Sequence, residues 1–286
     1  MGKQHGKKLF VACLVLCFIA VLTFIYYLPI NYVKNVNKEE KTILLPLGQE
    51  KNGVNPINTN NRKAKVAIVI DDFGQFNQSG IEEMMSIRKP LTFAVMPNLE
   101  FSQIAANKGA KSGFEIIVHL PMEPKKGKSS WLGPGAIVST MNTNQIKHRA
   151  SLDLAAIPGA IGFNNHMGSL ICSNENLIRP VLEAAKEKNF FVLDSGTDEH
   201  SLIIPLAHQM KIPCVKRDIF LDNDKSISHI KKQLDLLADR ALTNGGAIGI
   251  GHVGLGGEKT AQALQEMIPI MENKGIEFVY LSELVK

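Results

Sequence analysis

The sequence predicts an α/β fold, either a (β/α) barrel or an open parallel sheet, formed by residues 64–286. From Lys65 onward, short apolar runs alternate with segments whose apolar residues recur at helical spacing. The runs are too apolar for a sheet with one face in water, so we expect parallel strands that are buried on both faces. Seven or eight such alternations in roughly 220 residues suit either architecture.

The expected strands are the apolar runs, and the expected helices lie between them. The runs are KVAIVI, LTFAVM, FEIIV, AIGF, FFVL, IPCV, AIGIG and IEFVYL. Apolar residues at spacings of three and four predict helices around residues 81–85, 177–185, 227–241 and 264–271. Ser79 and Glu82 match a capping box before the first of these helices. Ser226 is placed to cap the third, and Gly275 to end the fourth.

The N-terminal part of the chain predicts a membrane anchor. Residues 1–8 contain three lysines, and residues 9–30 are uncharged and apolar, about the length that spans a bilayer. The positive-inside tendency keeps residues 1–8 in the cytoplasm and exports the rest. No small-x-small cleavage site follows, which favours an uncleaved signal-anchor over a removed signal peptide. Residues 31–63 are polar and are expected to be a flexible linker. We therefore expect a membrane-anchored protein whose domain lies on the extracytoplasmic side, in the bacterial cell envelope.

The charge and aromatic content argue against a nucleic-acid partner. The net charge is +5, and Lys3, Lys7 and Lys8 supply three of those units. Aromatic residues make up 6% of the chain, and no run of basic residues interleaves with them as in a single-strand binder. Outside residues 9–30 the cysteines are Cys172 and Cys214, which form either one disulfide or two buried thiols.

Ionisable or metal-ligating side chains follow most of the expected strands. In chain order they are Asp71, Asp72, His119, Glu123, Asn165, His166, Asp194, Asp218 and His252. Because the carboxyl ends of parallel strands meet at one edge, we expect these residues to line one mouth. A single Asp there is often a helix cap and a single His a structural residue. Two adjacent carboxylates after a buried strand, however, are costly unless a cation or a proton compensates them.

These residues suggest a metal-dependent reaction. Asp72, His119 and His166 would supply one carboxylate and two imidazoles, a ligand set typical of catalytic zinc with an open position. Such a metal polarises a carbonyl and lowers the pKa of water. Asp71 is then the candidate general base, and His252 is the candidate general acid.

At these residues the sequence resembles the divergent polysaccharide deacetylase family, a branch of the metal-dependent polysaccharide deacetylases. The stretches that carry the resemblance are IDDFG, HLPMEP, WLGPGAI, IPGAIGFNNHMGS, LDS, KRDIFLDN and IGH. The resemblance implies a distorted (β/α) barrel, a divalent metal that is usually zinc, and hydrolysis of N- or O-acetyl groups on a glycan. On that pattern Asp71 corresponds to the base, Asp72 to the metal carboxylate and His252 to the acid.

The sequence departs from the wider family at one ligand position. Ordinary members carry His-x-x-x-His after the third strand, whereas here Glu123 stands four residues after His119. His166 is the expected replacement for the second histidine. Glu123 is then a ligand, a partner of a ligand, or a capping acid. The usual arginine–proline motif after the fourth strand is also not evident.

Further polar residues and one aromatic residue are candidates for substrate binding or for orienting the site. Asp194 is expected to orient a histidine or bind substrate, and Asn165 to do either from the next loop. Trp131, the only tryptophan, either stacks on a sugar or packs as a lid. Asp222 is either a residue of the site or, as easily, a turn residue, and Arg217 is expected to pair with an acid.

The leading hypothesis is a metal-dependent extracytoplasmic hydrolase that removes acetyl groups from an amino-sugar polysaccharide, in carbohydrate metabolism or envelope glycan modification. An alternative is a catalytically impaired carbohydrate-binding or envelope-organising protein on the same fold. A third is a metal-dependent hydrolase that acts on something other than a glycan, such as a small amide.

Overall fold

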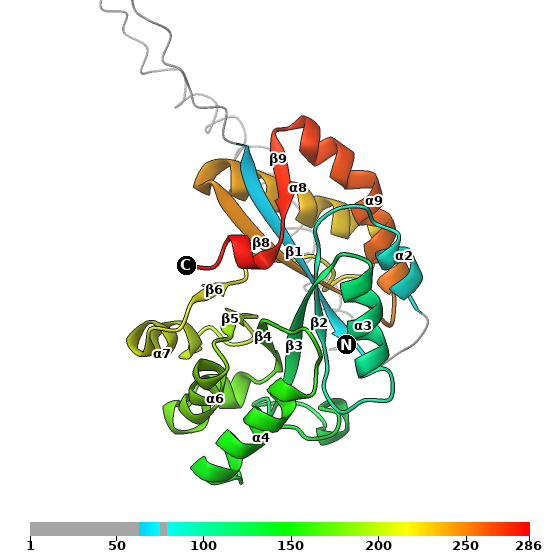
Figure 1. Cartoon of the computed structure of the whole chain (residues 1–286). Coiled ribbons are helices and arrows are strands. Elements are labelled where there is room, and N and C mark those ends of the chain that lie inside the picture. Colours follow the sequence, from blue (N-terminus) through cyan, green and yellow to red (C-terminus); the bar gives the residue numbers. More distant parts are fainter. Residues whose placement is uncertain (1–62, 75–78) are drawn as a thin grey trace, which may run out of the picture. The chain divides into compact units, whose positions relative to one another are not determined.

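The computed structural model describes residues 63–74 and 79–286 (Figure 1). The predicted anchor at residues 9–30 and nearly all of the predicted linker lie outside these ranges, so both stay predictions. No helix within the described ranges is long and apolar enough to cross a membrane.

The described part of the chain is built around nine strands whose pairings are all parallel. They are β1 (Ala64–Phe73), β2 (Thr92–Val95), β3 (Glu115–Met122), β4 (Gly162–Met167), β5 (Phe191–Asp194), β6 (Cys214–Lys216), β7 (Ile219–Phe220), β8 (Gly246–His252) and β9 (Ile276–Val279). Their order is β6-β5-β4-β3-β2-β1-β8-β7, with β9 also paired to β1. The predicted parallel α/β fold is therefore confirmed, and eight of the nine strands are those read from the apolar runs.

The barrel is open, because among the described residues no pairing joins β6 to β7. Only Arg217 and Asp218 separate these two short strands, which leaves no room for a helix between them. Instead the chain crosses to β8, where the Asp218 amide donates to the Ile248 carbonyl at 2.9 Å. The domain is therefore a curled, open sheet, a form between the two architectures predicted, the distorted (β/α) barrel and the open parallel sheet.

β1 is the central strand of this sheet. It pairs with β8 over Lys65–Asp71, and on its other side with β9 over Ala64–Ala67 and with β2 over Val69–Phe73. This register places Asp71 directly beside His252. Two residues from opposite ends of the domain therefore meet at one strand end.

The helices cover the sheet (Figure 1). They are α2 (Ile81–Met85), α3 (Ser102–Lys111), α4 (Thr143–Ala155), α5 (Ser169–Cys172), α6 (Glu175–Glu187), α7 (Ile203–Met210), α8 (Ile227–Asn244) and α9 (Gly257–Asn273), with single 3-10 turns η1 (Ser129–Trp131) and η2 (Leu281–Glu283). α2, α6, α8 and α9 match the predicted segments, whereas the sequence pattern missed α3, α4, α5 and α7. α3, for example, buries Ala105, Ala106 and Gly109, which are too small to give a clear apolar pattern.

The predicted capping box before α2 is wrong. The helix begins after Gly80 at φ 78°, and the Ser79 hydroxyl donates to Glu258 of α9 at 3.0 Å. A Cβ on residue 80 would lie 2.4 Å from the Gly257 backbone, so the close approach of α2 to α9 requires glycine there. The predicted cap at Ser226 is confirmed, since its side chain accepts from the His229 amide.

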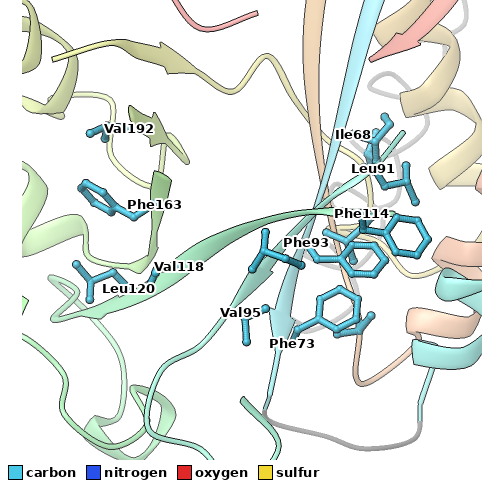
Figure 2. Packing of buried hydrophobic residues seen from close by; sticks show 14 of the residues in the cluster. Ile68, Phe73, Leu91, Phe93, Val95, Phe114, Val118, Leu120, Phe163 and Val192 are labelled. Carbon is cyan, nitrogen blue, oxygen red and sulfur yellow. The ribbon is translucent and has the colours of Figure 1, made fainter. Parts of the chain in front are cut away.

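Alternate residues of β1 enter two different buried clusters, which confirms that the strand is buried on both faces. Ile68 and Ile70 pack toward the helices, in a cluster where the Phe93 ring stacks between Phe73 and Phe114 with centroids 4.2 Å apart on each side (Figure 2). Ala67 and Val69 belong instead to the inner cluster of the barrel, with Ile117 and Ile250 as neighbours there. Because side chains alternate along a strand, Asp71 continues this inner face.

Both cysteines of the domain are buried free thiols. Cys172 ends α5 and Cys214 begins β6. The structure thus favours the second of the two interpretations, and no disulfide joins them.

Candidate metal and catalytic site

Three predicted ligands converge at the carboxyl ends of β1, β3 and β4. One ligand atom from each of Asp72, His119 and His166 lies within 4.8 Å of the other two. Asp72 Oδ1 is 3.3 Å from His119 Nε2 and 3.2 Å from His166 Nδ1. Asp72 has φ 70°, a left-handed conformation that interrupts the strand alternation. The turn in the backbone lets Asp72 and Asp71 reach the same site.

The chemistry of this group suits a cation. His119 Nδ1 lies 2.8 Å from Asn164 Oδ1, and His166 Nε2 lies 3.2 Å from the Trp131 carbonyl oxygen. Each imidazole that donates to such an oxygen presents the lone pair of its other nitrogen, and these two nitrogens are 3.1 Å apart. They face Asp72 Oδ1, a buried carboxylate oxygen that has no hydrogen-bond donor among the described residues. Three acceptors that face one point repel one another unless a positive charge lies among them.

The pKa shifts of the group have the same origin. Burial raises the pKa of Asp72, but the two histidines outweigh burial and hold that pKa well below its usual range. Burial lowers the pKa of His119, but the charges of Asp71 and Asp72 outweigh it and raise the pKa overall. The carboxylates thus favour positive charge here, which a proton or a metal ion can provide.

Asp71 lies beside the ligand group without belonging to it. Its side chain is 2% exposed, and burial raises its pKa. Asp71 Oδ1 accepts a hydrogen bond from Asn164 Nδ2 at 2.9 Å, and Asp71 Oδ2 lies 3.7 Å from His119 Nε2. A buried carboxylate in this place is well positioned to take up a proton.

His252 is held by Asp222, for which the sequence left open a place in the site or in a turn. Asp222 is buried; its Oδ1 lies 2.7 Å from His252 Nδ1, and its Oδ2 accepts from the His252 amide at 2.9 Å. Thr260 and Lys225 also donate to Oδ2, at 2.8 and 2.9 Å. Burial lowers the pKa of His252, but the bond to Asp222 and its charge outweigh burial and raise the pKa to about 9. Burial raises the pKa of Asp222, but His252 and Lys225 together lower it to about 2.

One cavity of about 320 Å³ brings both groups together. Its lining includes Asp71, Asp72, His119, His166 and His252, with Pro124, Lys126, Asn165, Met167, Ser169, Ser195, Thr197 and Phe220 around them. The expectation that the strand-end residues line one mouth is therefore met for these five residues and Asn165, whereas Glu123, Asp194 and Asp218 do not line the cavity.

A model of the divergent polysaccharide deacetylase family matches residues 68–285. The chain belongs to this family. YibQ, an uncharacterised protein of Escherichia coli strain K12, is 31% identical over 204 residues, which are 71% of this chain and 62% of that protein. The match thus spans less than two thirds of the E. coli relative. An uncharacterised protein of Haemophilus influenzae strain ATCC 51907 is 30% identical over 191 residues, which are 66% of this chain and 67% of that protein.

A solved structure shares the fold of this member of the divergent polysaccharide deacetylase family. The uncharacterised protein ATU2773 from Agrobacterium tumefaciens C58 matches with a TM-score of 0.72 and 24% identity, over 79% of this chain and 91% of that chain. The likeness concerns the fold alone.

Glu123, at the position where ordinary polysaccharide deacetylases carry their second histidine, lies outside the ligand group. Its carboxylate accepts a hydrogen bond from the Ser139 amide at 2.6 Å. Its backbone amide donates to the Ile137 carbonyl at 2.9 Å, and this bond joins the two ends of the segment between residues 123 and 137. This geometry corresponds to the capping interpretation of Glu123.

Asn165 and Asp194 hold backbone turns at the rim of the cavity. The Ser195 amide donates to Asn165 Oδ1 at 2.9 Å, and Asn165 Nδ2 donates to the Met167 carbonyl at 2.7 Å. Asp194 Oδ1 accepts from the Gly196 amide at 2.8 Å, so this carboxylate orients a turn and not a histidine.

The structure corrects the prediction for Arg217 and excludes one of the two interpretations of Trp131. Arg217 donates to the carbonyl oxygens of Ser195 and Gly196 at 2.6 and 3.1 Å, instead of pairing with an acid as predicted. Its guanidinium also covers the Phe220 ring at 3.8 Å. Trp131 is 54% exposed, so its ring does not pack as a lid.

We expect His166→Ala to weaken zinc binding by more than roughly 100-fold, the upper range for loss of even an outer partner of a ligand. The variant removes one of three converging ligand atoms, and zinc bound to the full chain can be measured by competition with a chelating dye. Glu123→Gln is the matched control, because Gln still accepts from the Ser139 amide and should keep the wild-type zinc affinity. Equal losses in both variants would place Glu123 among the ligands.

We expect Asp222→Asn to lower the pKa of His252 from about 9 to 6.5 or below, because an amide cannot compensate the buried imidazolium. The ring-proton shifts of His252 in an NMR titration of the metal-free protein measure this change. An unchanged pKa would show that Asp222 does not set the charge of His252.

The same shift predicts a pH dependence of stability. Since folding raises the pKa of His252 from 6.5 to about 9, its contribution is complete below pH 6.5 and disappears as the pH rises through about 9. The free energy of unfolding, measured in urea at about pH 6 and about pH 10, should therefore fall more in the wild type than in Asp222→Asn.

Proposed function

We propose that the protein is a metal-dependent hydrolase that removes acetyl groups from an amino-sugar polysaccharide. The observation that carries this proposal is the meeting, in one cavity, of the Asp72–His119–His166 group with Asp71 and with His252, whose Nδ1 lies 2.7 Å from the buried Asp222. Ligand set, base and acid are the three parts that such a reaction needs, and it needs no nucleophilic serine or cysteine.

The metal in this proposal is zinc, held by Asp72, His119 and His166. Two imidazoles and one carboxylate with an open position are a usual ligand set of catalytic zinc. When bound, the ion supplies Lewis-acid polarisation of the acetyl carbonyl and stabilises the charge that develops on its oxygen.

Asp71 is the proposed general base. It is buried at the end of the inner face of β1, and its side chain contacts the ligand group without being part of it. There it takes the proton of the water that attacks the acetyl carbon. A protein that only binds a glycan has no need of such a buried carboxylate, which is costly to maintain.

His252 is the proposed general acid. Its Nδ1 contacts Asp222, which leaves Nε2 as the nitrogen that can give a proton to the leaving amine or hydroxyl of the sugar. The pKa near 9 keeps this imidazole protonated at neutral pH.

Trp131 is the proposed platform for a sugar ring. Phe220 is the aromatic residue that lines the cavity, but Arg217 covers its ring at 3.8 Å and His252 stacks on it with centroids 5.7 Å apart. Lys128 Nζ lies 5.8 Å from the centroid of the Trp131 ring, but the residue is still 54% exposed, and its backbone carbonyl contacts the ligand His166. An aromatic face in this position suits the apolar face of a sugar.

The cellular place of the reaction is part of the proposal. We infer from the lysines of residues 1–8 and the uncharged residues 9–30 that the chain is anchored in a bacterial membrane, with the domain on the extracytoplasmic side. The envelope glycans found there are the proposed substrates.

We expect Asp71→Asn to lower kcat by about 10²–10⁴-fold, the usual contribution of a general base, while zinc content stays at the wild-type level. Release of acetate from N-acetylglucosamine oligomers measures the first effect, and elemental analysis of the same samples the second. Asp235→Asn on the outer surface of α8 is the control and should leave both unchanged. The enzymatic proposal fails if wild-type protein binds no metal and Asp71→Asn changes nothing.

We expect Trp131→Ala to raise KM for the same oligomers by up to about tenfold, since aromatic stacking contributes roughly 1.5 kcal/mol at most. The value of kcat should hold, because the backbone carbonyl that contacts His166 remains. Leu152→Ala, another exposed apolar residue but on α4, is the control. An unchanged KM in Trp131→Ala would remove this residue from the sugar site.

A further inference from the structure

We infer that Asn164 is a positioning residue that fixes both the base and one metal ligand through a single amide group, an inference that rests on the proposed function. Asn164 is fully buried in β4. Its Nδ2 donates to Asp71 Oδ1 at 2.9 Å and to Ser195 Oγ at 3.2 Å, and its Oδ1 lies 2.8 Å from His119 Nδ1. Both amide protons and one oxygen lone pair are therefore in use.

The position of Asn164 follows from the register of the sheet. His119 and Asn164 are paired neighbours on the parallel strands β3 and β4. Paired residues of adjacent strands point to the same face, so both side chains enter the interior of the barrel beside Asp71. Asn165, the next residue, alternates away and contacts the Ser195 backbone and Thr197 instead.

The orientation of the amide is set by Asp71. An ionised carboxylate offers only acceptors, so the NH₂ end of Asn164 must face it. A reversed amide would place its oxygen against Asp71 Oδ1, where two acceptors would meet at hydrogen-bonding distance. The opposite end of the amide, its oxygen, is therefore directed at His119.

This orientation determines the tautomer of His119. A carbonyl oxygen at 2.8 Å requires a proton on Nδ1, which leaves the Nε2 lone pair directed at Asp72 Oδ1, 3.3 Å away. The tautomer of His166 is fixed in the same way by the Trp131 backbone carbonyl, which lies near its Nε2. His119 differs because it depends on a side chain, so its orientation can be altered by substitution.

Two substitutions separate the two contacts. Asn164→Leu keeps the approximate volume and removes both, whereas Asn164→Asp keeps an acceptor for His119 and loses the donor to Asp71. We expect Asn164→Leu to weaken zinc binding by roughly 10- to 100-fold, as is typical for loss of an outer partner of a ligand. Asn164→Asp should retain zinc affinity within a few-fold but lower kcat, because a second negative charge lies beside the base.

The test measures zinc affinity of the full chain by chelator competition, together with the ring N–H protons of the zinc-loaded protein by NMR. In wild type and Asn164→Asp we expect an exchange-protected Nδ1–H signal of His119, which Asn164→Leu should lose. The His166 Nε2–H signal is the internal control and should persist in all three proteins. Asn165→Leu, equally buried but without contact to Asp71 or His119, should lose stability while it keeps zinc affinity.

The outcomes separate this inference from the proposed function. If wild type binds zinc and Asn164→Leu binds it equally well with the His119 signal intact, the inference is overturned and the proposed function stands. If Asn164→Leu and Asn165→Leu lose zinc to the same extent, the role of Asn164 is structural and the inference also fails. If wild type binds no zinc, both proposals are overturned together.

Discussion

The site depends on how the domain compensates two adjacent carboxylates at the end of a buried strand. β1 pairs with three other strands, so Asp71 and the ligand oxygen of Asp72 are withdrawn from water. Removing a carboxylate from water costs several kcal/mol unless charge or hydrogen bonds replace the solvent. His119 and His166 face Asp72, and the Asn164 amide faces Asp71. The side chains at the neighbouring strand ends therefore supply the charge and the hydrogen bonds that these two carboxylates need.

The backbone gives the two carboxylates different surroundings. Asp71 continues the inner face of β1 after Ala67 and Val69, and it meets an amide donor there. Asp72 adopts φ 70°, a conformation that costs a non-glycine residue about 1–2 kcal/mol, and its side chain reaches the histidines instead. In our proposal this is why one carboxylate binds the metal and its neighbour is free to act as a base.

Much of the fold was predictable because two-sided burial leaves a clear signature in sequence. The long apolar runs of the central strands predict buried strands, and α6, α8 and α9 carry broad apolar faces that predict helices. β7 is two residues long and α3 buries only small side chains, so neither gives a pattern above that of a loop. The start of α2 depended on the close packing of Gly80 on Gly257, which is a contact between distant segments.

The sequence by itself determined which chemical groups gather at the mouth, because the carboxyl ends of parallel strands must meet whatever the details of packing. Asp71, Asp72, His119, His166 and His252 could all be named on that basis. Only the tertiary structure decided what holds them. Asn164 lies 93 residues from Asp71, and Asp222 lies 30 residues from His252. In sequence alone, an Asn or an Asp is most simply interpreted as a turn or cap residue. Strand register and burial bring Asn164 to Asp71 and Asp222 to His252.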